Sequence, residues 1–292
     1  MPRLGVIGGS GLYDLPEVTD GETIDLDTPF GRPSSQPRLG RLGDTEIVFI
    51  ARHGPGHVYS PSDLPYRANV YALKQLGVGH VLSVSAVGSL SEALPPRSLV
   101  LPDQIVDRTV LRPRTFFERG VVAHVGIADP FCPVLRQRIA DAARATDHAV
   151  DAGGSYVCIE GPQFSTRAES LLYRSWGASV IGMTAMPEAR LAREAELCYA
   201  TLALVTDFDV WHETENPVTV ELVLEHLTAN VAAAAAIIRA LAKADLPART
   251  CPCADALAGA IITAPDRITD DQRARLGVIA GRYLGAGAAS GA

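Results

Sequence analysis

Short apolar runs alternate with helical stretches along this chain, and this alternation constrains the fold more than any other feature. Several runs are almost unbroken in apolar character, as strands buried on both faces should be. The intervening stretches carry apolar residues at three- to four-residue spacing. The pattern predicts an α/β fold, a single domain with a mixed, mostly parallel twisted sheet flanked by helices. The expected strands are 3–9, 46–51, 80–86, 98–106, 155–160, 178–183 and 200–207, and the expected helices are 64–77, 133–146, 166–177, 187–198 and about 217–244.

Length and composition narrow the class further. The 292 residues are 47% hydrophobic and 20% charged, which is typical of a globular protein with a sizeable core. A formal net charge of -7 argues against nucleic acid or an anionic membrane as a partner. We find neither a secretory signal nor a membrane-spanning run, so a cytoplasmic protein is expected. Residues 1–265 are expected to form the main domain, and 266–292 a helix followed by a disordered tail.

Five cysteines in this length do not make a disulfide framework. Cys132, Cys158 and Cys198 lie in apolar surroundings and are interpreted as buried free thiols. The pair Cys251 and Cys253 could be a redox switch or half of a metal site. No second thiol or histidine cluster has complementary spacing, so the sequence predicts no metal site.

Polar residues follow several of the expected strands, where ligands bind in sheets of this kind. The turn GVIGGSGLYD offers backbone N–H groups and the Ser10 hydroxyl to an anion, but it fits neither a dinucleotide fingerprint nor a P-loop. Arg52 and His53 follow the second run and could supply donors to a phosphate. Further candidates at later strand ends are Ser85, Ala86, Met183 and Thr184.

Two aspartates end the last expected strand, in the segment VTDFDVW. Alternation along an extended strand would point Asp207 and Asp209 the same way, with Phe208 opposite. The pair could bind a metal, accept hydrogen bonds from a ligand, or form an acidic turn. Metal binding is disfavoured because no histidine or third acid joins them at ligand spacing. With the strand-end donors, they predict a site for phosphate plus a flat polar ring.

Nine ordered motifs carry a family resemblance, from about residue 4 to 265. They are GVIGGSGLYD, DTPFGRPS, ARHGPGH, SAVGSL, DRT…RP, DPFCP, IEGPQFSTRAES, GMTAMPEA and VTDFDVW. The chain resembles the methylthioadenosine phosphorylase branch of the trimeric purine nucleoside phosphorylase family. The resemblance implies a phosphorylase/hydrolase-like fold, no cofactor, inorganic phosphate as co-substrate, and a homotrimer with shared active sites. It implies cleavage of 5′-deoxy-5′-methylthioadenosine into adenine and 5-methylthioribose 1-phosphate.

The resemblance also assigns roles to single positions. Asp207 would protonate purine N7 as the general acid, and Asp209 would face the exocyclic amine. This pair favours 6-aminopurines, since a 6-oxo group would set oxygen against oxygen. The phosphate ligands would be Ser10, Arg52, His53, Ser85, Ala86 and Thr184, and the nucleoside would contact Phe164, Met183, Phe208, His124 and Val223, with Ser165 and Val220 setting specificity.

The 5′ substituent is less constrained by the sequence. The resemblance implies that His124 reaches the 5′ pocket from a neighbouring subunit and that Val220 and Val223 give this pocket an apolar wall. By residue type alone, the two valines could be core residues of an amphipathic helix, and His124 a surface residue. Gly182 stands where relatives of the eukaryotic type carry Asn, and Ile261 or Ile262 is expected to close the pocket. The alternatives are a phosphorylase for 5′-halo-5′-deoxyadenosine or methylthioinosine, a general purine nucleoside phosphorylase, and, in another class, a non-catalytic purine-binding protein.

Overall fold

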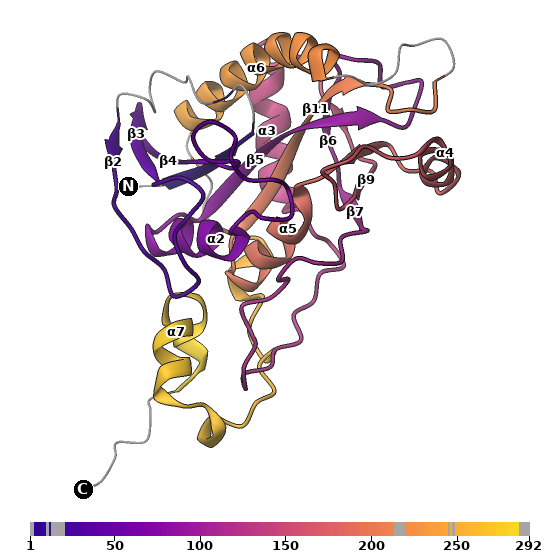
Figure 1. The fold of residues 1–292 in the computed structure, drawn as a ribbon. Helices are drawn as coiled ribbons and strands as arrows, with labels where there is room; N and C mark the ends of the chain where they lie inside the picture. Colours follow the sequence, from indigo (N-terminus) through magenta and orange to yellow (C-terminus); the bar gives the residue numbers. More distant parts are fainter. Residues whose placement is uncertain are drawn as a thin grey trace, which may run out of the picture.

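The strands join into one mixed sheet in the computed structural model, which describes residues 3–9, 12, 21–212, 220–244, 246 and 249–285 without the side chains of 220–225 (Figure 1). Most strand pairs are parallel, as predicted. The order is β2-β3-β4-β1-β5-β10-β9-β7, and β11 pairs with both β5 and β6, while β8 pairs with β6. The strands are β1 (Arg3–Gly8), β2 (Glu22–Thr23), β3 (Arg38–Leu42), β4 (Thr45–Ala51), β5 (His80–Ser89), β6 (Leu99–Leu101), β7 (Gln104–Asp107), β8 (Asp151–Ala152), β9 (Ser155–Cys158), β10 (Val180–Gly182) and β11 (Cys198–Asp207).

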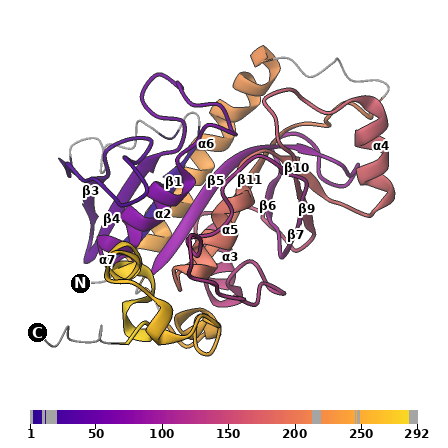
Figure 2. The ribbon, with the colours of Figure 1, turned by 60° about the horizontal axis from the view of Figure 1, so that its bottom comes forward.

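Helices cover both faces of the sheet (Figure 2). Successive side chains of a strand point to opposite faces. Val6 accordingly packs in a cluster with α3 and α6, whereas Ile7 packs in a second cluster with α2, α5 and α7. The helices in the described part of the chain are α2 (Tyr66–Gln75), α3 (Pro133–Arg144), α4 (Arg167–Ser175), α5 (Ala185–Glu194), α6 (Val220–Lys243) and α7 (Asp270–Ala280). None of them is long and apolar enough to cross a membrane.

The structure refines several boundaries that the sequence predicted. The run 98–106 divides into β6 and β7, because Pro102 between them has no N–H to continue a ladder. Thr166 caps α4, in a capping box with Glu169. The helix expected after Pro265 is α7, and its Leu276 is buried in the core. Of the expected tail, LGAGAASGA (284–292), Leu284 is buried in the core, and 286–292 lies outside the described residues.

One strand pairing decides where the site forms. β5 runs parallel to β1 and β11, but its last residues pair antiparallel with β10, so that Ile181 lies beside Gly88. β10 therefore arrives from the opposite direction. The segment after Gly182 lies alongside the last residues of β5. The ends of β4, β5, β10 and β11 thus meet in one region.

Candidate active site

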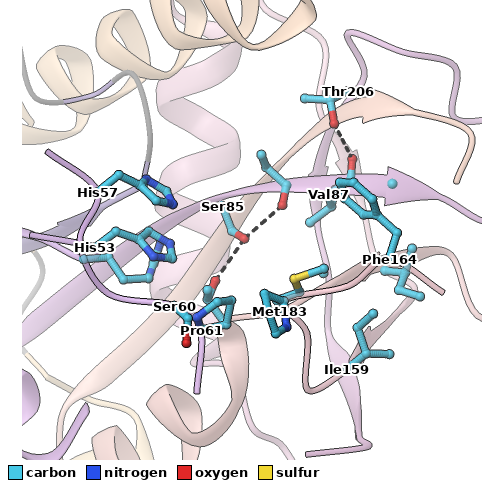
Figure 3. A pocket seen from close by; sticks show the side chains of 18 of the residues that line it. His53, His57, Ser60, Pro61, Ser85, Val87, Ile159, Phe164, Met183 and Thr206 are labelled. Carbon is cyan, nitrogen blue, oxygen red and sulfur yellow. Dashed lines mark hydrogen bonds between the residues drawn. The ribbon is translucent and has the colours of Figure 1, made fainter. Parts of the chain in front are cut away.

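A cavity of about 530 Å³ lies where these strand ends meet (Figure 3). His53 and His57 stand on one side of it, Ile159 and Phe164 on the other, and Ser85 and Met183 between them. Ten residues of the sequence-predicted site line the cavity. They are Arg52, His53, Ser85, Ala86, Phe164, Ser165, Met183, Thr184, Asp207 and Asp209.

Arg52 is at the cavity, but most of its donors are already used. Its side chain is 1% exposed, and Nε and Nη2 donate to the buried Glu188 carboxylate at 2.6 and 3.2 Å. Nη1 donates to the Val84 carbonyl at 2.7 Å, and Nη2 to Ser83 Oγ at 2.7 Å. Of the five N–H groups of a guanidinium, a second one on Nη1 is left for a ligand. This atom lies beside Gly9, where an added Cβ would be 3.2 Å from it.

His53 is held as a neutral ring. Burial lowers its pKa to about 4, and the charge of Arg52 adds to the shift. Nδ1 lies 2.9 Å from the Tyr59 carbonyl, and a carbonyl can only accept, so Nδ1 carries the proton. Nε2 is then an acceptor. In this tautomer the free ring nitrogen of His53 offers an acceptor, whereas the sequence interpretation had the side chain as a further donor.

Hydroxyl groups gather beside these two residues. Ser85 Oγ lies 3.2 Å from Thr184 Oγ1 and 3.3 Å from Tyr156 Oη. The three hydroxyls come from β5, β9 and the residue before α5, and all three are buried. Ala86 lines the same part of the cavity. Ser10, also predicted here, lies outside the described residues.

Two buried aspartates lie further along the same strand pair. Asp207 is level with Gly88 of β5, whereas Ala203 is level with Ser85. At about 3.3 Å a residue, the backbone of Asp207 is thus roughly 10 Å further along the strand pair than that of Ser85. That span suits a nucleoside lying between an anion and a base-binding group.

The aspartates converge by a turn rather than by strand alternation. Asp209 has a φ of 52°, in the left-handed region, and its backbone N–H donates to Asp207 Oδ1 at 2.7 Å. Burial raises the pKa of both carboxyls, that of Asp209 to about 6, and the Asp207 charge adds to the latter shift. The nearby Ser170 hydroxyl opposes this rise in the pKa of Asp209, yet the buried Asp209 Oδ2 makes no hydrogen bond of normal geometry to the described residues. It is available to a donor on a ligand.

Thr206 gives Asp207 two hydrogen-bonding options. Its hydroxyl donates to Asp207 Oδ2 at 2.7 Å, and the Val87 carbonyl lies within reach at 3.2 Å. When Asp207 is ionised, the hydroxyl stabilises the carboxylate. When Asp207 is protonated, the hydroxyl proton can turn to the carbonyl, so neither state leaves it unpaired.

The walls of the cavity are partly apolar. Met183 and Ile159 line it, and Phe164 lines it while remaining 46% exposed. Ser165 Oγ, also buried, has no hydrogen-bond partner in the part of the chain that the structure describes. Phe208 does not line the cavity and is corrected: its ring stacks on His212 at 4.7 Å and packs edge-on against Trp211 at 5.6 Å, on the far side of the turn.

The residues predicted for the 5′ pocket lie elsewhere or outside the described part. His124 is exposed at a second cavity of about 440 Å³, and its backbone N–H donates to the Ala260 carbonyl. Ile261 lies on the same edge, through a bridge to Ala123, with Ile262 next to it and 60% exposed. The side chains of Val220 and Val223 lie outside the described residues.

Three residues that position the predicted ligands were missed by the sequence interpretation. They are Glu188, which pairs with Arg52; Tyr59, whose carbonyl orients His53; and Tyr156, which contacts Ser85. Glu188 had a signal, an acid in the otherwise apolar start of a predicted helix (AMPEARLA). The other two act through contacts that spacing along the chain does not reveal.

Comparison with known proteins places the chain in a family. The profile of the Phosphorylase superfamily matches residues 3–243. An S-methyl-5′-thioadenosine phosphorylase of Koribacter versatilis is 49% identical over 97% of each chain, and one of Chloroflexus aurantiacus is 53% identical over 96% of this chain and 98% of its own. The chain belongs to the phosphorylase superfamily and is an enzyme of the pentosyltransferase class.

Solved structures place it more narrowly. A methylthioadenosine phosphorylase from an antarctic soil metagenomic library superposes with a TM-score of 0.89, at 45% identity over 95% of this chain and 98% of that one. The methylthioadenosine phosphorylase of Schistosoma mansoni in complex with adenine superposes with a TM-score of 0.80, at 39% identity over 83% of this chain and 91% of that one. Within the superfamily, the chain groups with these enzymes.

Proposed function

We propose that the protein cleaves 5′-deoxy-5′-methylthioadenosine with inorganic phosphate, giving adenine and 5-methylthioribose 1-phosphate without a cofactor. The observation that carries the proposal is a single cavity lined both by Arg52 with the buried hydroxyls of Ser85 and Thr184 and by the two buried aspartates further along the same strand pair. The names of the relatives, and the adenine complex of the Schistosoma enzyme, support the choice of nucleoside.

The phosphate end would hold the nucleophile by oriented donors. The remaining Nη1 hydrogen of Arg52 and the hydroxyls of Ser85 and Thr184 can donate to phosphate oxygens. Neutral His53 can accept from the P–OH of a monoprotonated phosphate. Held in place, the anion would attack the anomeric carbon as the glycosidic bond breaks, and its charge would stabilise the oxocarbenium-like sugar. Positioning and preorganised dipoles supply the acceleration in such a scheme.

The purine end would accept the departing base. Asp207, with its raised pKa, would protonate N7 while Thr206 turns to the Val87 carbonyl. The unpartnered Asp209 Oδ2 would accept from the 6-amino group. A 6-oxopurine would offer an acceptor to that acceptor, which leaves buried groups unpaired.

The first experiment is chromatographic release of free base with and without phosphate. Methylthioadenosine, methylthioinosine, adenosine and 5′-chloro-5′-deoxyadenosine are compared in parallel. We expect phosphate-dependent adenine release, fastest with methylthioadenosine. Preference for the chloro compound would leave the proposed reaction unchanged and would replace methylthioadenosine as the proposed substrate. Hypoxanthine release alone would contradict the aspartate assignment, and binding without turnover would favour the purine-binding alternative.

The general-acid assignment has its own test. We expect Asp207→Asn to lower kcat for methylthioadenosine by about 10²- to 10⁴-fold, because an amide cannot deliver the proton. The KM for phosphate should change little. Asp44→Asn, at an exposed turn, is the control. Equal losses in turnover and phosphate affinity would remove Asp207 from the acid role.

A homotrimer with shared sites completes the proposal. His124 is exposed outside the cavity of the proposed site in its own chain, beside Ala260. A neighbouring subunit would bring this edge to the sugar end of the cavity. Light scattering should give the mass of three chains, and His124→Ala should raise the KM for methylthioadenosine without dissociating them. A monomer with full activity would contradict this part.

A further inference from the structure

Four of the five cysteines converge in the core on the α3 and α6 side of the sheet. Their sulfur atoms all lie within 4.8 Å of one another, and all four residues are buried. The segments that bring them are far apart in sequence: the residue before α3, the first residue of β11, and the C-terminal segment around Pro252–Asp255. The cluster consists of Cys132, Cys198, Cys251 and Cys253.

The sequence spacing did not reveal this arrangement. Cys251 and Cys253 have no second pair of thiols at complementary spacing in the sequence, and zinc was disfavoured on that premise. The fold supplies that pair, because Cys132 and Cys198, interpreted as isolated thiols, lie next to them. The premise was therefore wrong, and the cluster has the ligand set of a structural zinc site.

The distances suit a metal better than disulfides. Cys251 Sγ lies 3.6 Å from Cys132 Sγ and 3.3 Å from Cys198 Sγ. With Zn–S bonds of about 2.3 Å, the sulfurs of a tetrahedral site lie about 3.8 Å apart. A disulfide needs about 2.05 Å and one partner for each sulfur. Cys251 has two neighbours at similar distances, so no unique pairing is selected.

The surroundings suit four thiolates around a cation. The backbone N–H of Leu135, in the first turn of α3, donates to Cys132 Sγ at 3.5 Å. Arg193 Nη1 donates to Cys253 Sγ at 3.5 Å. Four thiolates around a divalent ion leave two negative charges. The helix N-terminus and the guanidinium offset part of them, as outer-shell donors do in metal sites.

We propose that these four cysteines bind one zinc ion as a structural site. Each thiol gives up its proton to solvent as its sulfur bonds to the metal, so no oxidant is needed. The ion would fix the C-terminal segment to the sheet and to α3. That segment carries Ile261, which bridges to Ala123 beside His124. The site would thereby hold in place the edge on which His124 lies. The zinc proposal does not depend on the role that is proposed above for His124 in the 5′ pocket.

Metal content of the untagged, full-length protein is the direct test. The protein is purified under reducing conditions from zinc-supplemented cells, dialysed without chelator, and analysed by plasma mass spectrometry. We expect about one zinc per chain in the wild type and in Cys158→Ala. In Cys253→Ser the zinc content per chain should fall at least about tenfold. Cys158 is the matched control, because it is equally buried but outside the cluster. Less than stoichiometric zinc in the wild type, or iron in its place, would overturn the proposal.

A second measurement does not depend on any variant folding. Titration of the wild type with a mercurial should release zinc in step with four thiols, while Cys158 reacts separately. Cobalt added to metal-depleted protein should give the visible bands of a tetrahedral thiolate complex. A mass lower by two or four hydrogens, showing disulfides, would overturn the proposal, as would five free thiols with no zinc released. Both readouts are independent of nucleoside cleavage.

Discussion

Asp209 shows how one buried carboxyl links the site to stability. Its pKa is about 6 in the folded protein and near 3.8 in the unfolded chain. Between these values the folded state binds more protons, so stability falls as the pH rises through this window. Above it the charged group costs on the order of 3 kcal/mol.

We therefore expect Asp209→Asn to stabilise the protein at pH 7.5 by up to about 3 kcal/mol relative to its effect at pH 4. Thermal unfolding of both proteins at the two pH values measures this difference. A stability change that does not depend on pH would show that the carboxyl is not held at a raised pKa. Activity should fall in the same variant, since the amide offers the 6-amino group one acceptor oxygen where the carboxylate offers two.

Glu188, unlike Asp209, stabilises the folded protein in its charged form, because it balances the buried charge of Arg52. Its carboxylate accepts from Arg52, Ser83 and Tyr199, and both members of the ion pair are 1% exposed. We expect Glu188→Gln to cost about 3–5 kcal/mol in unfolding free energy, because Arg52 is left buried without its counter-charge. Glu46→Gln, which breaks the more exposed pair with Arg3, should cost less than about 1 kcal/mol. Similar losses in denaturation midpoint for the two variants would contradict this.

At the scale of elements, the close contact between β10 and β9 depends on one glycine. A Cβ at Gly182 would lie 2.0 Å from Tyr156 Oη and 3.1 Å from the Val87 side chain. The Asn of eukaryotic-type relatives would not fit here unless Tyr156 moved. Tyr156 and Gly182 thus form one packing unit that places the Ser85 hydroxyl.

Gly182→Ala should lower both the melting temperature and kcat/KM, because displacement of Tyr156 disturbs Ser85 and Thr184. Gly277→Ala is the control, since nothing lies within 4 Å of its added Cβ in α7. Replacing this helical glycine should be neutral or stabilising by up to about 1 kcal/mol. An active, stable Gly182→Ala variant would show that the contact with Tyr156 is easily relaxed.

The sequence predicted the long buried elements and missed the short exposed ones. The runs that became β1, β4, β5 and β11 are continuous and apolar, which periodicity detects well. β3 is partly exposed, yet the Gly43–Asp44 turn before β4 is a hairpin signal that could have found it. β2 and β8 have two residues each, too few for any pattern.

For the whole molecule, the site residues at strand ends were predictable because parallel strands bring their ends to one edge. Contacts made across the fold were not. The convergence of Cys132 and Cys198 with Cys251 depends on how α3 and the C-terminal segment pack on β11. The position of Asp209 depends on the left-handed turn that it forms, which strand alternation does not anticipate.

The Arg52–Glu188 pair has a further consequence for the molecule in solution. Arg52 is the permanent cation among the described residues lining the cavity, its charge is balanced by Glu188, and His53 is neutral. Phosphate would therefore be bound by oriented dipoles rather than by net positive charge. We expect the KM for phosphate to change less than about twofold as added inert salt shortens the Debye length from about 30 to about 8 Å. A steep rise would reveal an uncompensated cation at the site; a flat response would mean that the enzyme takes up its co-substrate equally well at any cellular ionic strength.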